Sequence, residues 1–272
     1  MSKIRKALEK AKQTRKADVV NMFREGETVP VAGPPTPKET EPVGETPAVA
    51  AQTRKILCDV RTLRKNKIIT RCNGEIIADH LKLLRTQVLN SMKDCGANSL
   101  LITSANAREG KTFTAINLAM SISQEVDHTV LLVDADLRSP SIHEYFGLDV
   151  EAGLADYLLR RAEVQDLLIN PGVEKMVILP AGRGLPNSSE LLGSSQMQSL
   201  AQEMKARYPD RFIIFDSPAL LDGADALVIA NFVDGVLLVV EEEKTTQKEL
   251  REALDLLSGK KIIGIILNKT RE

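Results

Sequence analysis

The segment 104–115, SANAREGKTFTA, holds the residue types that bind nucleotide phosphates. It follows an apolar run and opens a helical pattern, which is the context that a phosphate-binding loop requires. Backbone N–H groups at the start of the helix would point at the phosphates. Lys111 would place its charge on the β- and γ-phosphate oxygens, and the Thr112 hydroxyl would ligate Mg²⁺. Gly110 would let the backbone approach closely.

The loop departs from the usual pattern at two positions. Ala105 stands where the first glycine is expected, and we expect it to be tolerated if its φ is negative. If the turn requires a positive φ at Arg108, the side chain costs on the order of 1 kcal/mol. The residues expected to contact the nucleotide are Ala105, Asn106, Ala107, Arg108, Glu109, Gly110, Lys111, Thr112 and Phe113.

Three carboxylates follow apolar strands further along the chain. Asp134 and Asp136 end LLVDAD, and Asp216 ends FIIFD. A carboxylate at the end of a buried strand needs a partner, and ligands of parallel α/β sheets bind at the carboxyl ends of the strands. We therefore expect the three carboxylates to converge with Lys111 around one magnesium triphosphate.

The elements that must position these residues alternate along the chain. Short, β-branched apolar runs predict strands at 99–103, 129–133, 176–180, 212–215, 235–240 and 262–267. Helical patterns cover 74–92, 111–123, 153–161, 188–206, 223–232 and 245–259. Nearly continuous apolar strands are typical of a sheet covered on both faces. The order predicts an α/β fold of the P-loop NTPase type, with a mostly parallel sheet flanked by helices.

Composition narrows the class of protein. The net charge of -1 and the aromatic content of 3%, without Trp, argue against a nucleic-acid-binding role. Cys58, Cys72 and Cys95 have no metal-like spacing and are expected to be reduced thiols of a cytosolic protein. No apolar run approaches the roughly 18 residues that a membrane span needs. We expect a cytoplasmic protein.

The chain is expected to have three parts. Residues 1–24 form a basic pattern with a thin apolar face at helical spacing. This helix either docks on a partner or an anionic membrane surface, or is simply solvated. Residues 25–57 are rich in Pro, Glu and Thr and predict a disordered linker. Residues 58–272 then form the P-loop domain, which carries the phosphate-binding loop and the three carboxylates.

The carboxylate segments resemble a known family. LLVDADLRSP is similar to the second Walker motif of the bacterial tyrosine kinases of exopolysaccharide export, and FIIFDSP to their Walker B motif. The resemblance covers roughly residues 75–270, and a basic KALEKA start is similar to the autokinases of exosortase-associated loci. It implies that Lys111 and Thr112 bind ATP–Mg²⁺ and that Asp136 and Asp216 help hold the metal. Asp134 would accept the proton of an attacking tyrosine hydroxyl.

The same resemblance supplies two further expectations. Asn268, after the last strand, would contact the adenine or be a plain turn residue. The helix at 74–92 carries Asp79, Lys82 and Arg85 where the family has its Glu-x-x-Arg-x-x-Arg oligomerisation motif. Lys cannot make the bidentate carboxylate pairing of Arg, so either a homo-oligomer forms more weakly or this is a solvated charged face.

The tyrosines of the chain are the candidate acceptors of the phosphate. The family's clustered C-terminal tyrosines are missing, and the tyrosines present are Tyr145, Tyr157 and Tyr208. Tyr157 is expected in the core, whereas Tyr145 is either a core residue or lies near the cleft. The acceptor is therefore expected on another protein.

Three functions stay open at this point. The first is an ATP- and Mg²⁺-dependent protein-tyrosine kinase that regulates exopolysaccharide biosynthesis and export. A membrane polysaccharide co-polymerase would activate it at the inner face of the membrane. The second is a MinD/ParA-like ATPase switch, although Asn106 stands at that class's additional lysine. The third is a non-catalytic, ATP-binding regulator of the co-polymerase.

Overall fold

A computed structural model describes residues 53–68, 75–93, 96–207 and 210–270. The expected basic helix at 1–24 and nearly all of the expected linker at 25–57 lie outside these residues, as do Cys72, Cys95 and Tyr208. Within the described ranges, no helix combines the length and apolar character needed to cross a membrane.

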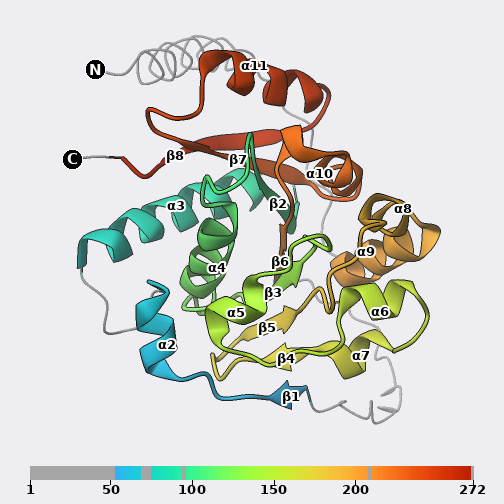
Figure 1. The fold of residues 1–272 in the computed structure, drawn as a ribbon. Coiled ribbons are helices and arrows are strands. Elements are labelled where there is room, and N and C mark those ends of the chain that lie inside the picture. Colours follow the sequence, from blue (N-terminus) through green and yellow to red (C-terminus); the bar gives the residue numbers. More distant parts are fainter. Residues whose placement is uncertain (1–52, 69–74, 94–95, 208–209, 271–272) are drawn as a thin grey trace, which may run out of the picture. The chain divides into compact units, whose positions relative to one another are not determined.

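A mostly parallel sheet of eight strands forms the centre of the described part (Figure 1). The strand order across the sheet is β1-β4-β5-β3-β6-β2-β7-β8, and β4 runs antiparallel to β5. The strands are β1 (Arg54–Lys55), β2 (Ser99–Ser104), β3 (Thr129–Asp134), β4 (Ile169–Asn170), β5 (Met176–Leu179), β6 (Arg211–Asp216), β7 (Gly235–Glu241) and β8 (Ile262–Asn268). Every strand predicted from an apolar run is present, which confirms the predicted α/β fold.

The helices lie between the strands along the chain. They are α2 (Val60–Lys65), α3 (Glu75–Lys93), α4 (Lys111–Ile122), α5 (Ile142–Phe146), α6 (Leu154–Leu158), α7 (Val164–Leu167), α8 (Ser188–Leu192), α9 (Ser195–Arg207), α10 (Asp225–Ile229) and α11 (Gln247–Leu256), with a 3₁₀ turn, η1 (Leu220–Asp222). The helix predicted over 188–206 is in fact two. The Ser194 hydroxyl accepts a hydrogen bond from the Met197 N–H and so begins α9 as its N-cap.

The sheet begins earlier in the sequence than the domain boundary expected at residue 58. β1 pairs in parallel with β4, with Arg54 opposite Ile169 and Lys55 opposite Asn170. Both strands have two residues, too few for a period-two pattern to be visible in the sequence. Residues 53–57 therefore belong with the folded part.

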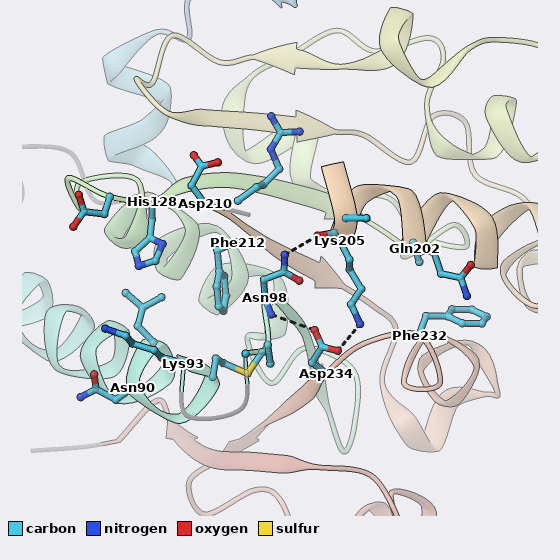
Figure 2. Close-up of a pocket in the computed structure, with 18 of the residues that line it drawn as sticks. Asn90, Lys93, Asn98, His128, Gln202, Lys205, Asp210, Phe212, Phe232 and Asp234 are labelled. Carbon is cyan, nitrogen blue, oxygen red and sulfur yellow. Dashed lines mark hydrogen bonds and ion pairs between the residues drawn. The ribbon is translucent and has the colours of Figure 1, made fainter. Parts of the chain in front are cut away.

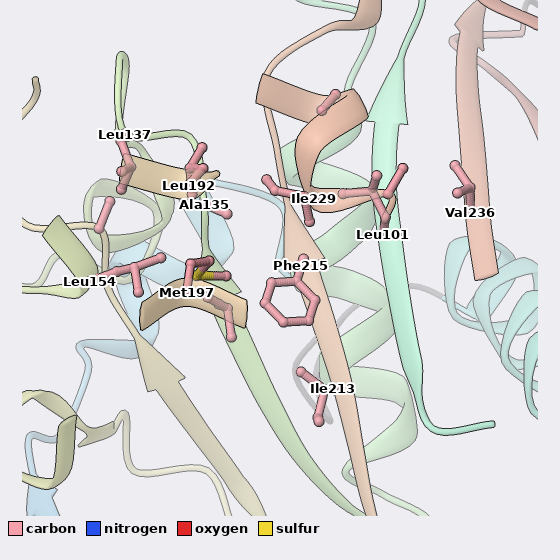
Figure 3. Close-up of a cluster of buried hydrophobic side chains, with 14 of the residues drawn as sticks. Leu101, Ala135, Leu137, Leu154, Leu192, Met197, Ile213, Phe215, Ile229 and Val236 are labelled. Carbon is pink, nitrogen blue, oxygen red and sulfur yellow. The ribbon is translucent and has the colours of Figure 1, made fainter. Parts of the chain in front are cut away.

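Each buried strand contributes side chains to two cores, one on each face of the sheet. In β6, Ile213 and Phe215 belong to one core, and Phe212 and Ile214 to the other. Figure 3 shows Ile213 and Phe215 with Met197 of α9 on the first face. The second core includes residues of α3 and α4. Both faces are therefore covered, and a ligand can reach the strands at their ends.

Candidate phosphate-binding site

The loop between β2 and α4 has the conformation of a tight turn around its glycine. Gly110 has a φ of 99°, and a Cβ there would lie 2.1 Å from Nδ2 of Asn268. A side chain at this position would thus be both strained and blocked. Arg108 has a φ of 65°, so the expected cost of a non-glycine residue in the left-handed region applies. Ala105 is buried and does not have a positive φ, which fits its tolerance there.

A buried glutamate holds the loop from within. The Glu109 side chain accepts a hydrogen bond from the Asn106 backbone N–H at 2.9 Å and another from the Thr245 hydroxyl. Glu109 is fully buried, and a buried carboxylate is costly unless it is hydrogen-bonded. Thr245 precedes α11 and is remote in sequence, so its contribution was not visible in any local motif.

The end of β8 holds the loop from outside. Asn268 donates from Nδ2 to the carbonyl of Glu109 at 2.8 Å, and Lys269 donates from Nζ to the carbonyl of Arg108 at 2.8 Å. Lys269 also pairs with Glu241 at 3.0 Å. Two carbonyls of the loop are thereby fixed, and the adenine contact of Asn268 stays a prediction.

The lysine and the carboxylates converge at the carboxyl ends of the strands. Lys111 Nζ lies 3.5 Å from Oδ2 of Asp136, and both side chains are largely buried. Asp134 and Asp216 are opposite each other in the register of β3 and β6. The juxtaposition predicted from the sequence is present in the structure.

Asp134 is tied to the backbone that follows it. Its Oδ1 accepts from the N–H of Asp136 at 3.2 Å, and its Oδ2 accepts from the N–H groups of Ser141 and Ile142, both at 3.1 Å. Burial, and then the nearby charge of Asp216, raise the pKa of Asp134 well above its usual value. Asp134 thus fixes the loop between β3 and α5.

Asp216 is the polar group that this site leaves unsatisfied. Neither of its buried carboxylate oxygens accepts a well-formed hydrogen bond from the described residues. Burial raises the pKa of Asp216 to about 7, although the charge of Lys111 and the nearby Thr112 hydroxyl act to lower it. A buried carboxylate without a partner calls for a ligand or ion.

The oxygen ligands of the site suit Mg²⁺ with a nucleotide. Thr112, Asp136 and Asp216 offer a hydroxyl and two carboxylates, the hard ligands that Mg²⁺ takes in such sites. In the described ranges no group of three or more His, Cys, Asp or Glu residues could hold a metal by itself.

Tyr145 lies beside this site. Its side chain is half-buried, and its pKa is raised by burial and by the charge of Asp216, while Lys111 acts in the opposite direction. Tyr157 packs against the first core, as predicted. Tyr145 also packs against the second core, so both alternatives for it, core residue and neighbour of the cleft, hold in part.

The charged face of α3 is partly occupied within the chain. Arg85 donates to the carbonyl of Ser121 at 2.8 Å and pairs with Glu125 at 2.6 Å. Lys82 pairs with Asp79 at 2.9 Å on the exposed surface. Arg85 thus secures α3 to the end of α4, and its oligomerisation role remains a prediction.

A cavity of about 1130 Å³ opens at the opposite, amino-terminal edge of the sheet (Figure 2). Asn98 precedes β2 there, and Asp234 precedes β7. Asp234 accepts hydrogen bonds from Asn98 and Ser99 and pairs with Lys205. These contacts join the starts of the strands, and the cavity contains none of the predicted site residues.

The chain matches the CobQ/CobB/MinD/ParA nucleotide-binding domain over residues 100–272. MinD of Pyrococcus horikoshii, solved in complex with Mg-ADP, superposes with a TM-score of 0.53 at 25% identity, over 62% of this chain and 69% of that one. The chain belongs to this nucleotide-binding domain family.

Other similarities are higher and more specific. The chain is 34% identical over 208 residues to the tyrosine-protein kinase YwqD of Bacillus subtilis, covering 76% of this chain and 86% of YwqD. A Klebsiella pneumoniae protein whose name places it in the cps region is 33% identical over 197 residues, 72% of this chain and 27% of that protein. The kinase domain of the Escherichia coli tyrosine kinase Etk has a TM-score of 0.67 at 27% identity, over 80% and 91% of the two chains. The chain belongs to the bacterial tyrosine kinases.

Proposed function

We propose that this chain is an ATP- and Mg²⁺-dependent protein-tyrosine kinase that regulates exopolysaccharide biosynthesis and export. The observation that carries the proposal is the convergence of Lys111 with Asp134, Asp136 and Asp216 at one edge of the sheet, in a member of the bacterial tyrosine kinases. The MinD/ParA-like switch is less favoured because that class's additional lysine is Asn106 here.

The chain's own residues have distinct roles in this proposal. Backbone N–H groups of 105–112 would hold the phosphates. Lys111, which faces Asp136 in the structure, would contact the γ-phosphate instead when ATP is bound. Thr112, Asp136 and Asp216 would hold Mg²⁺. When bound, this ion neutralises negative charge on the β- and γ-phosphates.

Transfer forms a bond between the tyrosine oxygen and the γ-phosphorus while the bond to the leaving ADP oxygen breaks. The hydroxyl proton would go to Asp134, whose raised pKa suits a group that takes up a proton. Because Asp134 is buried and hydrogen-bonded to Ser141 and Ile142, this role requires the loop between β3 and α5 to shift and expose it.

The partners follow from the same proposal. A membrane polysaccharide co-polymerase would act as the activator, protein tyrosines would be the acceptors, and copies of the chain would associate through α3. This would place the kinase at the inner face of the membrane. A relative named for the cps region supports the link to polysaccharide production.

The test is phosphoryl transfer from labelled ATP with Mg²⁺ to a tyrosine-containing peptide, with and without vesicles carrying the candidate co-polymerase. Phosphoamino-acid analysis should find phosphotyrosine, and the Lys111→Met variant should give none. ATP binding without any phosphotyrosine would favour the non-catalytic regulator. Nucleotide-dependent dimerisation with ATP hydrolysis but no transfer would favour the switch.

A further inference from the structure

An open groove of about 460 Å³ lies next to the phosphate-binding loop. Its lining comes from the end of α2, the first turn of α4, and α5: Lys65, Asn66, Lys67, Phe113, Glu144 and Tyr145. Figure 1 shows α2 beside α5. No role assigned to the site so far uses the α2 side of this groove.

The groove leads to the place where phosphate would be transferred. Phe113 follows the proposed Mg²⁺ ligand Thr112 directly in α4. Tyr145 is close enough to Asp216 and Lys111 for both charges to affect its pKa. A peptide in the groove would therefore reach the γ-phosphate within a short length of chain.

The groove is held by specific contacts. Asn66 donates from Nδ2 to the carbonyl of Tyr145 at 2.8 Å and to that of Glu144 at 3.4 Å. Gly147, with a φ of 65°, ends α5 against Thr62, where an added Cβ would be 3.1 Å from the Thr62 methyl group. These contacts fix α2 against α5, so the groove is formed before any ligand arrives.

The α2 side of the groove carries an excess of positive charge. Lys65 and Lys67 line the groove, and Arg61 and Arg64 are exposed on the same short segment. None of the four forms an ion pair with a described residue. Nearby acidic groups are Asp59, which caps α2, and Glu144. The chain as a whole has a net charge of -1, so this positive charge is local.

We propose that this groove binds the segment around the phosphate-accepting tyrosine, and that it selects acceptors with Asp or Glu beside that tyrosine. The inference rests on the proposed kinase function and names the substrate class for it. Unpaired cations complement acidic side chains, and Phe113 offers an apolar surface for part of the peptide. An anionic membrane would meet the same cations, but the concave shape and the position beside Lys111 favour a peptide.

The experiment measures peptide binding separately from turnover. A fluorescent peptide with a tyrosine between glutamates, and a matched peptide with glutamines, are titrated by anisotropy with Mg²⁺ and a non-hydrolysable ATP analogue. The full chain is compared with Lys65→Glu/Lys67→Glu and with Lys248→Glu/Arg251→Glu, a matched charge reversal on exposed positions of α11. Thermal melts verify that each variant is folded.

We expect the groove variant to bind the acidic peptide about tenfold more weakly, as reversal of charges at an interface does. The affinity for the glutamine peptide should change little in the groove variant, and the α11 variant should bind both peptides almost as the native chain does. Added salt should weaken binding of the acidic peptide. The same groove variant should raise KM for the acidic peptide more than it lowers kcat. Equal binding of both peptides, or equal effects of the two variants, would overturn the proposal.

Three further outcomes separate this proposal from others. Selective binding of the acidic peptide without any phosphotyrosine would support the groove as a peptide-binding site and contradict the kinase function. If the groove variant phosphorylated both peptides with the kcat/KM of the native chain, the kinase function would be supported and the role of the groove contradicted. Loss of binding to phosphatidylserine vesicles with unchanged peptide binding would assign the cations to a lipid surface and overturn the proposal.

Discussion

Asp134 and Asp216 stand opposite each other at the carboxyl ends of β3 and β6, and both side chains are fully buried. Burial raises the pKa of each, and a nearby charge adds to it: that of Asp216 for Asp134, and that of Asp136 for Asp216. Asp134 is compensated by backbone N–H groups. Asp216 depends on Lys111 and on Thr112, and a bound cation would complete its surroundings.

Replacement of Lys111 by Met should abolish turnover while the fold is retained. The variant removes the cation that faces Asp136 and that lowers the pKa of Asp216. Loss of one positioned charge in a water-excluded site costs on the order of 100-fold or more in rate. Phosphotyrosine formation and circular dichroism measure the two effects, and normal activity in a folded variant would rule out this site.

The Asp136→Ala variant should weaken the Mg²⁺ dependence and the rate together. Asp136 lies at the site with Oδ2 toward Lys111, whereas its Oδ1 accepts the Ser139 N–H at 2.9 Å. Turnover is measured against Mg²⁺ concentration at saturating ATP. An unchanged Mg²⁺ midpoint would remove Asp136 from the metal site.

Asp216 should make the nucleotide-free protein less stable as the pH rises toward 7. Its folded pKa of about 7 lies above the ordinary value of 3.8, so its contribution is complete below about pH 4 and is lost as the pH rises through 7. Urea unfolding at pH 5 and pH 8 measures the free energy of unfolding of the native chain and of Asp216→Asn. The native chain should lose more stability than the variant.

Bound Mg²⁺–ATP should reverse that trend, because a metal ion requires the ionised carboxylate. Affinity for Mg²⁺–ATP should therefore increase from pH 6 to pH 8 in the native chain. The same slope in Asp216→Asn would show that another group is responsible.

Asp134→Asn distinguishes a proton acceptor from a loop anchor. If Asp134 takes the tyrosine proton, phosphotyrosine formation should fall by about 100-fold or more with ATP affinity unchanged. If it only fixes the loop through Ser141 and Ile142, the melting temperature should fall with little change in rate. Single-turnover kinetics and thermal melts on one sample decide between the two.

Gly110→Ala should weaken nucleotide binding through strain in the loop. A Cβ at a φ of 99° costs about 1 kcal/mol, and here it would also meet Nδ2 of Asn268 at 2.1 Å. In Gly110→Ala/Asn268→Ala the collision is relieved, so the two effects should be less than additive. Calorimetry measures the ATP affinity of the native chain, both single variants and the double variant. Strictly additive losses of affinity would show that the two positions do not interact.

The sequence alone determined the strands and the loop, and it brought the candidate site residues to one edge of the sheet. Apolar runs such as 129–133 and 235–240 are long enough to define buried strands, and in a parallel sheet their ends must meet at one edge. Lys111, Asp134, Asp136 and Asp216 therefore followed from local pattern and a topological rule. Strands of two residues, such as β1 and β4, contain no such pattern.

Only the tertiary structure decided what holds that loop and what surrounds it. Thr245 reaches Glu109 across 136 positions of the chain, and Asn268 reaches it across 159. Arg85 is bound to α4 rather than exposed, and Tyr145 lies at the site beside the basic end of α2. These contacts depend on how helices and strand ends pack in three dimensions, because residue spacing along one element says nothing about partners so far away in sequence.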